Sequence, residues 1–86
     1  MRLDKYLKVS RIVKRRTVAN ELCSAGRVKV NGRTAKPGTE VKPGDVLEIG
    51  FGSGKTRLRI LSVRETVRKE EADTLYELLQ SDQQSS

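Results

Sequence analysis

The 86-residue chain has no histidine, no tryptophan and a single cysteine. It therefore lacks an imidazole base, cannot close an internal disulfide and offers no ordinary zinc site. Cys23 lies in a helical pattern, and we interpret it as a small buried residue rather than as a reactive thiol. We expect no catalytic residue, no metal and no other cofactor, and we predict that the protein is not an enzyme.

Aromatic residues and long apolar runs are also scarce. Only 3% of the residues are aromatic, too few for a platform on which single-stranded bases stack. No run resembles a signal peptide or reaches membrane-spanning length, and no basic helix carries the bulky apolar anchors that bind a membrane surface. We expect a cytoplasmic protein that buries about 60–65% of its unfolded-chain surface around a small aliphatic core.

Positive charge is abundant and unevenly placed. Residues 1–36 hold eleven lysines and arginines against two acids, a net charge of +9, whereas residues 37–86 hold seven cations and nine acids, a net charge of −2. Crowded cations repel one another unless an anionic partner neutralises them. This asymmetry points first to nucleic acid as the partner.

The spacing of apolar residues predicts two helices at the start of the chain. Leu3, Tyr6 and Leu7 indicate a first helix that ends around residues 10–12. A second helix is expected to begin near residues 15–17 and to stop at Gly26. Its inner face is expected to hold Val18, Ala19, Leu22 and Cys23.

From residue 27 the apolar period changes to two, which predicts strands. Asn31-Gly32 is a strong hairpin signal, and Gly52-Ser53-Gly54 indicates a second hairpin turn between strands over residues 46–51 and 57–63. The nucleic-acid-binding domain is predicted to span residues 1–64. An acidic amphipathic helix is expected over residues 65–80, followed by a disordered tail over residues 81–86. The predicted fold class is α+β, with two or three short helices packed on a small twisted antiparallel sheet.

Residues 14–17 open the second helix with three cations and a threonine. Cations are unfavourable at a helix N-terminus, but they suit a bound phosphate that also receives the free backbone N–H groups there. Asn31 is expected mainly to shape its turn, and Asp4 to cap a helix or to orient an arginine. The whole predicted RNA-binding site comprises Arg2, Asp4, Lys5, Lys8, Arg11, Lys14, Arg15, Arg16, Thr17, Arg27, Lys29, Asn31 and Arg33.

Composition leaves the type of nucleic acid open. Few aromatics favour recognition through backbone and shape, as in structured RNA, but two short helices joined by a tight turn also fit a DNA-reading helix-turn-helix. Residues 50–56 imitate a nucleotide-binding P-loop. That motif requires glycine where Ile49 stands and a helix where strand-like residues follow, so we do not expect it to bind ATP or GTP.

The sequence resembles the RNA-binding domain named after the fourth ribosomal protein of the small subunit. The resemblance covers about residues 1–64 and rests on Arg2-Leu3-Asp4, Leu7, Arg15-Arg16-Thr17, Ala19, Gly26-Arg27-Val28, Val30-Asn31-Gly32 and Gly44-Asp45. It implies two helices packed on a small twisted sheet, and RNA rather than DNA bound by the helical face. Within that family the chain is similar to the stand-alone ribosome-associated quality-control factors. It is also similar to a small heat-shock protein that recycles stalled large subunits, apart from that protein's long basic C-terminal extension.

The quality-control resemblance implies a factor that contacts rRNA and peptidyl-tRNA on an obstructed large ribosomal subunit. It would act beside an RqcH-type factor that adds alanine tails to the stalled chain, and we expect it to be a monomer. The resemblance also places Arg2, Asp4 and Arg16 on the RNA-facing side. The alternatives are an assembly or recycling factor that acts mainly through protein contacts of the acidic C-terminal segment, and an RNA-modifying enzyme. For an enzyme, the chain has no residues left over to form a catalytic domain.

Overall fold

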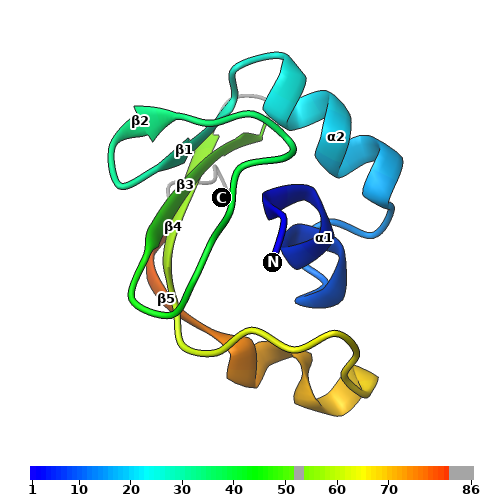
Figure 1. Cartoon of the computed structure of the whole chain (residues 1–86). Coiled ribbons are helices and arrows are strands. Elements are labelled where there is room, and N and C mark those ends of the chain that lie inside the picture. The colour runs from blue at the N-terminus through cyan, green and yellow to red at the C-terminus, as the bar shows by residue number, and fades with distance from the viewer. Residues whose placement is uncertain (52–53, 82–86) are drawn as a thin grey trace.

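The computed structural model describes residues 1–51 and 54–81 and forms two layers, helices against a sheet (Figure 1). The helices are α1 (Leu3–Val9), α2 (Arg16–Ser24) and the 3₁₀ helix η1 (Lys69–Leu75). The strands are β1 (Val28–Val30), β2 (Arg33–Thr34), β3 (Val46–Phe51), β4 (Gly54–Ile60) and β5 (Tyr76–Ser81). They pair antiparallel in the order β2-β1-β3-β4-β5. The predicted α+β class is confirmed.

Both α-helices form where the apolar spacing predicts them. One side of α1 is fully buried, and the helix ends at Val9, just before the predicted range. In α2, Ala19 and Cys23 are buried, but Leu22 is only half-buried and Val18 is exposed, so the inner face is narrower than predicted. Gly26 has a φ of 76° and donates its N–H to the Cys23 carbonyl, which confirms the predicted stop.

The first hairpin is the one that the sequence predicts. Asn31 and Gly32 have φ values of 52° and 85°, the left-handed conformations that a tight two-residue turn between twisted strands requires. Strand β1 also pairs with β3, and β3 pairs with β4 from Val46↔Arg59 to Phe51↔Gly54. The predicted second turn covers residues 52–54; residues 52 and 53 lie outside the described residues, and Gly54 is the first residue of β4 rather than part of the turn. Strand β4 ends at Ile60, so the predicted continuation to Val63 is wrong.

The C-terminal segment corrects the prediction of one helix over residues 65–80. Only residues 69–75 are helical, as the 3₁₀ helix η1, and residues 76–81 form β5 on the free edge of β4. Strand β4 would otherwise leave a row of backbone N–H and C=O groups unpaired, and this pairing outweighs the helical spacing of the apolar residues. The domain boundary at residue 64 stays a prediction, and residues 82–86 of the expected tail lie outside the described residues.

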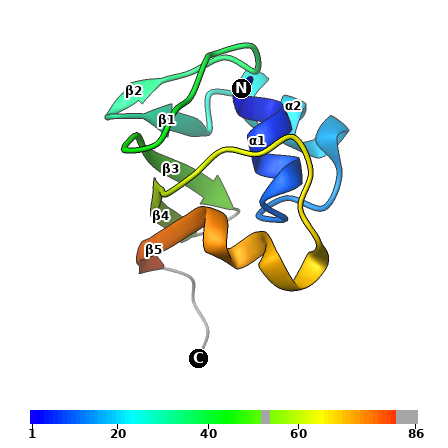
Figure 2. The same cartoon turned by 60° about the horizontal axis from the view of Figure 1, so that its bottom comes forward.

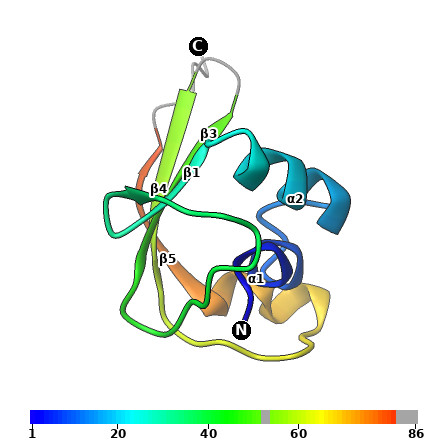
Figure 3. The ribbon, with the colours of Figure 1, turned by 45° about the horizontal axis from the view of Figure 1, so that its top comes forward.

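The core lies between the helices and one face of the sheet. Figure 3 shows α1, α2 and η1 on the same side of the strands. Leu47, Ile49, Leu58 and Ile60 project from β3 and β4 into the cluster that holds the buried residues of α1. The Tyr6 hydroxyl donates a 2.8 Å hydrogen bond to the Leu75 carbonyl, which ties α1 to the end of η1.

The first residues of the chain are held by the connection between β2 and β3. The Leu3 N–H donates to the Thr39 carbonyl at 2.8 Å, and the Val41 N–H donates to the Met1 carbonyl at 2.9 Å. Figure 2 shows the N-terminus beside this connection. The N-terminal end of α1 is therefore held by the connection between β2 and β3.

Candidate nucleic-acid interface

A buried carboxylate joins the starts of α1 and α2. Asp4 Oδ1 lies 3.2 Å from Arg2 Nε and 3.4 Å from Arg16 Nη2, and Asp4 Oδ2 lies 3.3 Å from Arg2 Nη2. The Asp4 side chain is 3% exposed, whereas those of Arg2 and Arg16 are 54% and 48% exposed. Because a guanidinium has five N–H donors, each arginine keeps donors that face solvent. The prediction that Asp4 orients an arginine is confirmed, and it orients two.

The electrostatics of this cluster keep Asp4 ionised. Burial alone would raise the pKa of Asp4, but the hydrogen bond and the charge of Arg16 outweigh it, with smaller contributions from Asn20 and Arg2. The pKa of Asp4 therefore lies below its ordinary value. A carboxylate that stays charged fixes both guanidinium groups before any ligand arrives.

The start of α2 has the features that suit an anion. Arg15 is extended ahead of the helix, and no side chain caps the N-terminal N–H groups of α2. Lys14, Arg15 and Thr17 are exposed, and Lys14 and Arg15 form no ion pair within residues 1–51 and 54–81. An open depression of about 430 Å³ lies beside them, lined by Asp4, Arg16, Thr17, Asn20 and Glu21. Phosphate binding here stays a prediction.

The remaining cations around α1 differ in their pairing with acids and in their position relative to the helix. Lys5 pairs with Glu65 of the segment that precedes η1, so its charge is partly satisfied within the protein. Lys8 is exposed near the C-terminal end of α1. Arg11 does not lie on the helix as predicted: it follows the helix end with a φ of 63°.

The hairpin residues form a separate group. In all three views the β1–β2 hairpin and the start of α2 lie at opposite sides of the molecule (Figure 1). Arg27 and Arg33 are exposed, whereas Lys29 lies 4.0 Å from Glu48. Asn31 donates to Asp45 at 3.1 Å and accepts from the Val46 N–H at 3.0 Å. These bonds confirm that Asn31 shapes the turn.

Sequence reasoning missed the acids that pair with the predicted cations. Glu48 and Glu65 lie far along the chain from Lys29 and Lys5, and no local spacing signals either contact. Asn20 of α2 also helps to lower the pKa of Asp4, and no local spacing signals this contact between the two helices. Cys23 is buried as predicted, and burial together with the Asp4 charge raises the pKa of its thiol to about 11.

The described part of the chain holds neither a candidate metal cluster nor a candidate membrane-spanning helix. No group of three or more His, Cys, Asp or Glu side chains there is arranged to hold a metal ion. No helix there is long and apolar enough to cross a membrane. What the described residues offer is a set of oriented and exposed cations.

Comparison with known proteins identifies relatives along nearly the whole chain. Residues 1–47 match the model of the S4 domain. The chain is 62% identical to the RQC P-site tRNA stabilizing factor of Halalkalibacterium halodurans, over 91% of this chain and 89% of that protein. It is 45% identical to the protein of the same name from Bacillus subtilis, over 95% of both chains.

A solved structure extends the comparison to the fold. The trimeric structure of Vibrio cholerae heat shock protein 15 superposes with a TM-score of 0.85 at 31% identity, over 92% of this chain and 81% of that one. A heat shock protein 15 homolog of Aeromonas salmonicida is 35% identical over 90% of this chain and 59% of its own length.

Proposed function

The chain belongs to the S4 domain family and, within it, to the RQC P-site tRNA stabilizing factors (RqcP), and from this premise we propose that it holds P-site tRNA on large ribosomal subunits during ribosome-associated quality control. It is an RNA-binding protein of a non-enzymatic family. It works by binding: its side chains contact RNA phosphates and retain the tRNA.

The observation that carries the proposal is the pair of arginines held by the buried Asp4. An arginine fork binds a phosphate through two parallel N–H donors, and it binds best when its orientation is fixed beforehand. Asp4 supplies that orientation at 3.2–3.4 Å while both guanidinium groups stay half exposed. The free N–H groups at the start of α2 lie beside them and add donors for the same backbone.

The finer assignment concerns two RNA segments. The helical face with Arg2 and Arg16 would contact rRNA of the obstructed large subunit, and the hairpin cations Arg27 and Arg33 would face the peptidyl-tRNA. The separation of the β1–β2 hairpin from the start of α2 supports contact with two separate RNA segments (Figure 1). The protein would act as a monomer in the cytoplasm, beside an RqcH-type factor that extends the stalled chain with alanine.

The alternative of an assembly or recycling factor that acts mainly through protein contacts relied on the acidic C-terminal segment. In the structure, Ala72 and Leu75 of η1 are buried against the domain itself. Glu70, Glu71 and Asp73 remain exposed. The acidic side chains of η1 therefore face solvent, and the cations of residues 1–36 remain the groups that would contact RNA.

Co-sedimentation with purified large subunits tests the proposal. Subunits that carry P-site tRNA should retain the full chain more strongly than vacant subunits, and Arg2→Gln should weaken both. Lys42→Gln, which removes an exposed cation outside the site, is the matched control. Equal retention with and without tRNA would contradict the tRNA assignment, and full retention of Arg2→Gln would contradict the site.

A further inference from the structure

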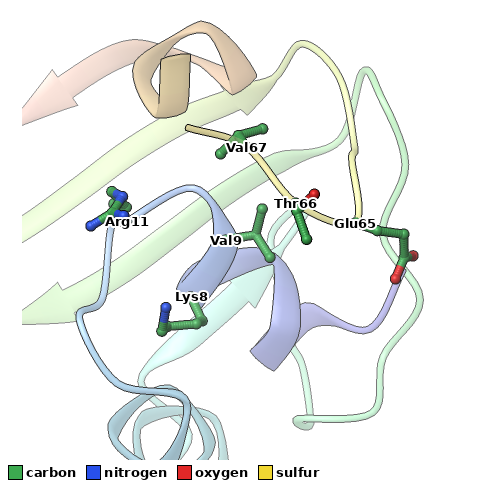
Figure 4. A pocket seen from close by; sticks show the side chains of 6 residues that line it. All are labelled: Lys8, Val9, Arg11, Glu65, Thr66 and Val67. Carbon is green, nitrogen blue, oxygen red and sulfur yellow. The ribbon is translucent and has the colours of Figure 1, made fainter. Parts of the chain in front are cut away.

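A pocket lies at the C-terminal end of α1, away from the Asp4 cluster. Lys8, Val9 and Arg11 face Glu65, Thr66 and Val67 across a volume of about 220 Å³ (Figure 4). Val9 and Val67 are partly buried against the core and form an apolar floor. We refer to this pocket as the α1 pocket.

The positive charges around the α1 pocket lie on one side of it. Figure 4 shows the Lys8 and Arg11 side chains on one side of the valines and the Glu65 carboxylate directed to the other. Glu65 pairs with Lys5, and the hydrogen bond and charge of Lys5 lower the pKa of Glu65. Lys8 and Arg11 form no ion pair with any residue that the structure describes. The pocket therefore presents two unpaired cations beside an apolar floor.

The backbone at Arg11 gives a second indication. Arg11 has a φ of 63°, the left-handed conformation in which glycine or asparagine normally ends a helix. Its N–H donates to the Lys8 carbonyl at 3.0 Å, so the residue does close α1. Glycine would close the helix with less strain, and the backbone gains nothing from arginine there. Favourable interaction of a cation with the helix C-terminus accounts for part of the choice. This interaction does not explain why the Arg11 side chain lines a pocket.

We propose that the α1 pocket binds one nucleotide of the engaged RNA, with its phosphate between Lys8 and Arg11 and its ribose on Val9 and Val67. The proposal rests on the proposed RNA-binding function and adds a contact that the Asp4 cluster does not make. A volume of about 220 Å³ is below the roughly 300–1,000 Å³ of pockets for drug-sized ligands. It suits one phosphate and its sugar rather than a free cofactor.

The position of Lys8 favours RNA over an acidic protein. Lys8 follows Asp4 by four residues, so the two lie on neighbouring parts of the α1 surface, about 6 Å apart along the helix axis. A strand that contacts Arg2 and Arg16 therefore continues toward the α1 pocket. A carboxylate side chain would satisfy the cations but offers less apolar surface to cover the two valines.

Binding to purified large subunits as a function of salt tests the pocket. The full chain is compared with Lys8→Gln/Arg11→Gln and with the control Arg64→Gln/Lys69→Gln, which removes the same charge from exposed positions outside the pocket. The pocket variant should bind about tenfold more weakly than the control, as expected for a lost charge-assisted contact. Its slope of log affinity against log salt should be less steep by about one. Equal affinities and slopes for the two double variants would overturn the proposal.

Arg16→Ala in the same assay distinguishes failure of the α1 pocket proposal from failure of the proposed function. If Arg16→Ala loses affinity while the pocket variant matches its control, the proposed function stands and the pocket is rejected. If the unmodified chain does not bind large subunits, the proposed function and the pocket proposal fail together. Arg11→Gly adds a readout of stability: a nucleotide-binding role predicts weaker binding with an equal or higher melting temperature. A lower melting temperature with unchanged binding would assign Arg11 to the fold alone.

The ligand class is tested by NMR titration of the full chain. Adenosine 5′-monophosphate should shift the amides of residues 8–11 and 65–67 more than inorganic phosphate does, and adenosine should shift them least. Larger shifts with a polyglutamate peptide would overturn the proposal in favour of an acidic protein partner. The absence of saturable shifts at these amides would overturn it outright.

Discussion

Residues 1–36 and residues 37–81 contain the same kinds of charged residue, but their acidic side chains have different roles. In residues 1–36 the acids are Asp4 and Glu21, and the buried Asp4 serves two arginines at once. In residues 37–81 acids are numerous, and Lys42, Lys55 and Arg59 each face one at 3.1–3.7 Å. The first region therefore holds two arginines that one buried acid orients toward solvent, whereas three exposed cations of the second region each pair with a single acid. Net charge identifies the region, but the placement of the acids identifies the site.

The largest expected effect is on salt dependence. If residues 2–36 engage about five to seven phosphates, affinity for large subunits should fall on the order of a thousandfold between 50 and 200 mM salt. A filter-binding or sedimentation titration measures it. An affinity nearly independent of salt would contradict this comparison. It would indicate that the binding surface lies in residues 37–81 instead.

The next largest effect concerns the stability of the fold. We expect it from the C-terminal end of the second region. Leu75→Ala should lower the free energy of unfolding by about 2–5 kcal/mol, because Leu75 is fully buried against the core. The control Leu79→Ala should change it by less than about 0.5 kcal/mol, because that side chain is 38% exposed. Urea denaturation of both variants provides the measurement. Similar losses would mean that the packing of η1 and β5 is different from that described.

Two exposed cations from the two regions should differ in RNA affinity. Arg16→Ala should cost about 1–3 kcal/mol of binding to large subunits, because it removes an oriented charge-assisted contact. Lys55→Ala should leave binding almost unchanged, because Lys55 Nζ on β4 lies 3.7 Å from Glu48 Oε2 on β3. ATP or GTP should raise the melting temperature of neither variant. Loss of binding in Lys55→Ala with normal binding in Arg16→Ala would reverse the assignment.

Arg16→Ala also revises an expectation drawn from the helix dipole alone. A cation at a helix N-terminus is unfavourable, so the helix dipole alone predicts that its removal leaves stability unchanged or raised. In the structure Arg16 is 3.4 Å from a buried carboxylate, which would lose one of its two partners. Thermal stability should therefore fall slightly, and a melting curve recorded beside the binding assay checks it.

The smallest effect is on pH dependence. The pKa of Asp4 is lower when folded than when unfolded, so its contribution to stability is present above the unfolded value and is lost as pH falls through the folded one. That window lies below about pH 4. The contribution should not exceed about 1 kcal/mol, because both arginines are half exposed and solvent screens them. Melting temperatures from pH 2 to 6 should fall less steeply for Asp4→Asn than for the unmodified chain.

Local signals in the sequence predicted the first part of the fold. The spacing of Leu3, Tyr6 and Leu7 predicts α1, Gly26 predicts the end of α2, and Asn31-Gly32 predicts the first hairpin. Each of these features depends on residues within a few positions of one another. The predicted role of Asp4 is confirmed for the same reason, since Arg2 is two residues away.

Features that depend on distant partners were not predictable in this way. Residues 76–81 have helical spacing, and only the free edge of β4 makes them a strand. The pairing of Lys5 with Glu65 spans 60 positions, so a charge count treats Lys5 as free. The α1 pocket likewise exists only because residues 65–67 return to the end of α1.

The hydrogen bond from the Tyr6 hydroxyl to the Leu75 carbonyl joins positions 69 residues apart. Synthesis proceeds from the N-terminus, so α1 is made well before its partner at residue 75. Contacts between such distant positions form late in folding, because a long loop must close first. This hydrogen bond, and the part of the core beside it, can therefore form only after residue 75 has been synthesised.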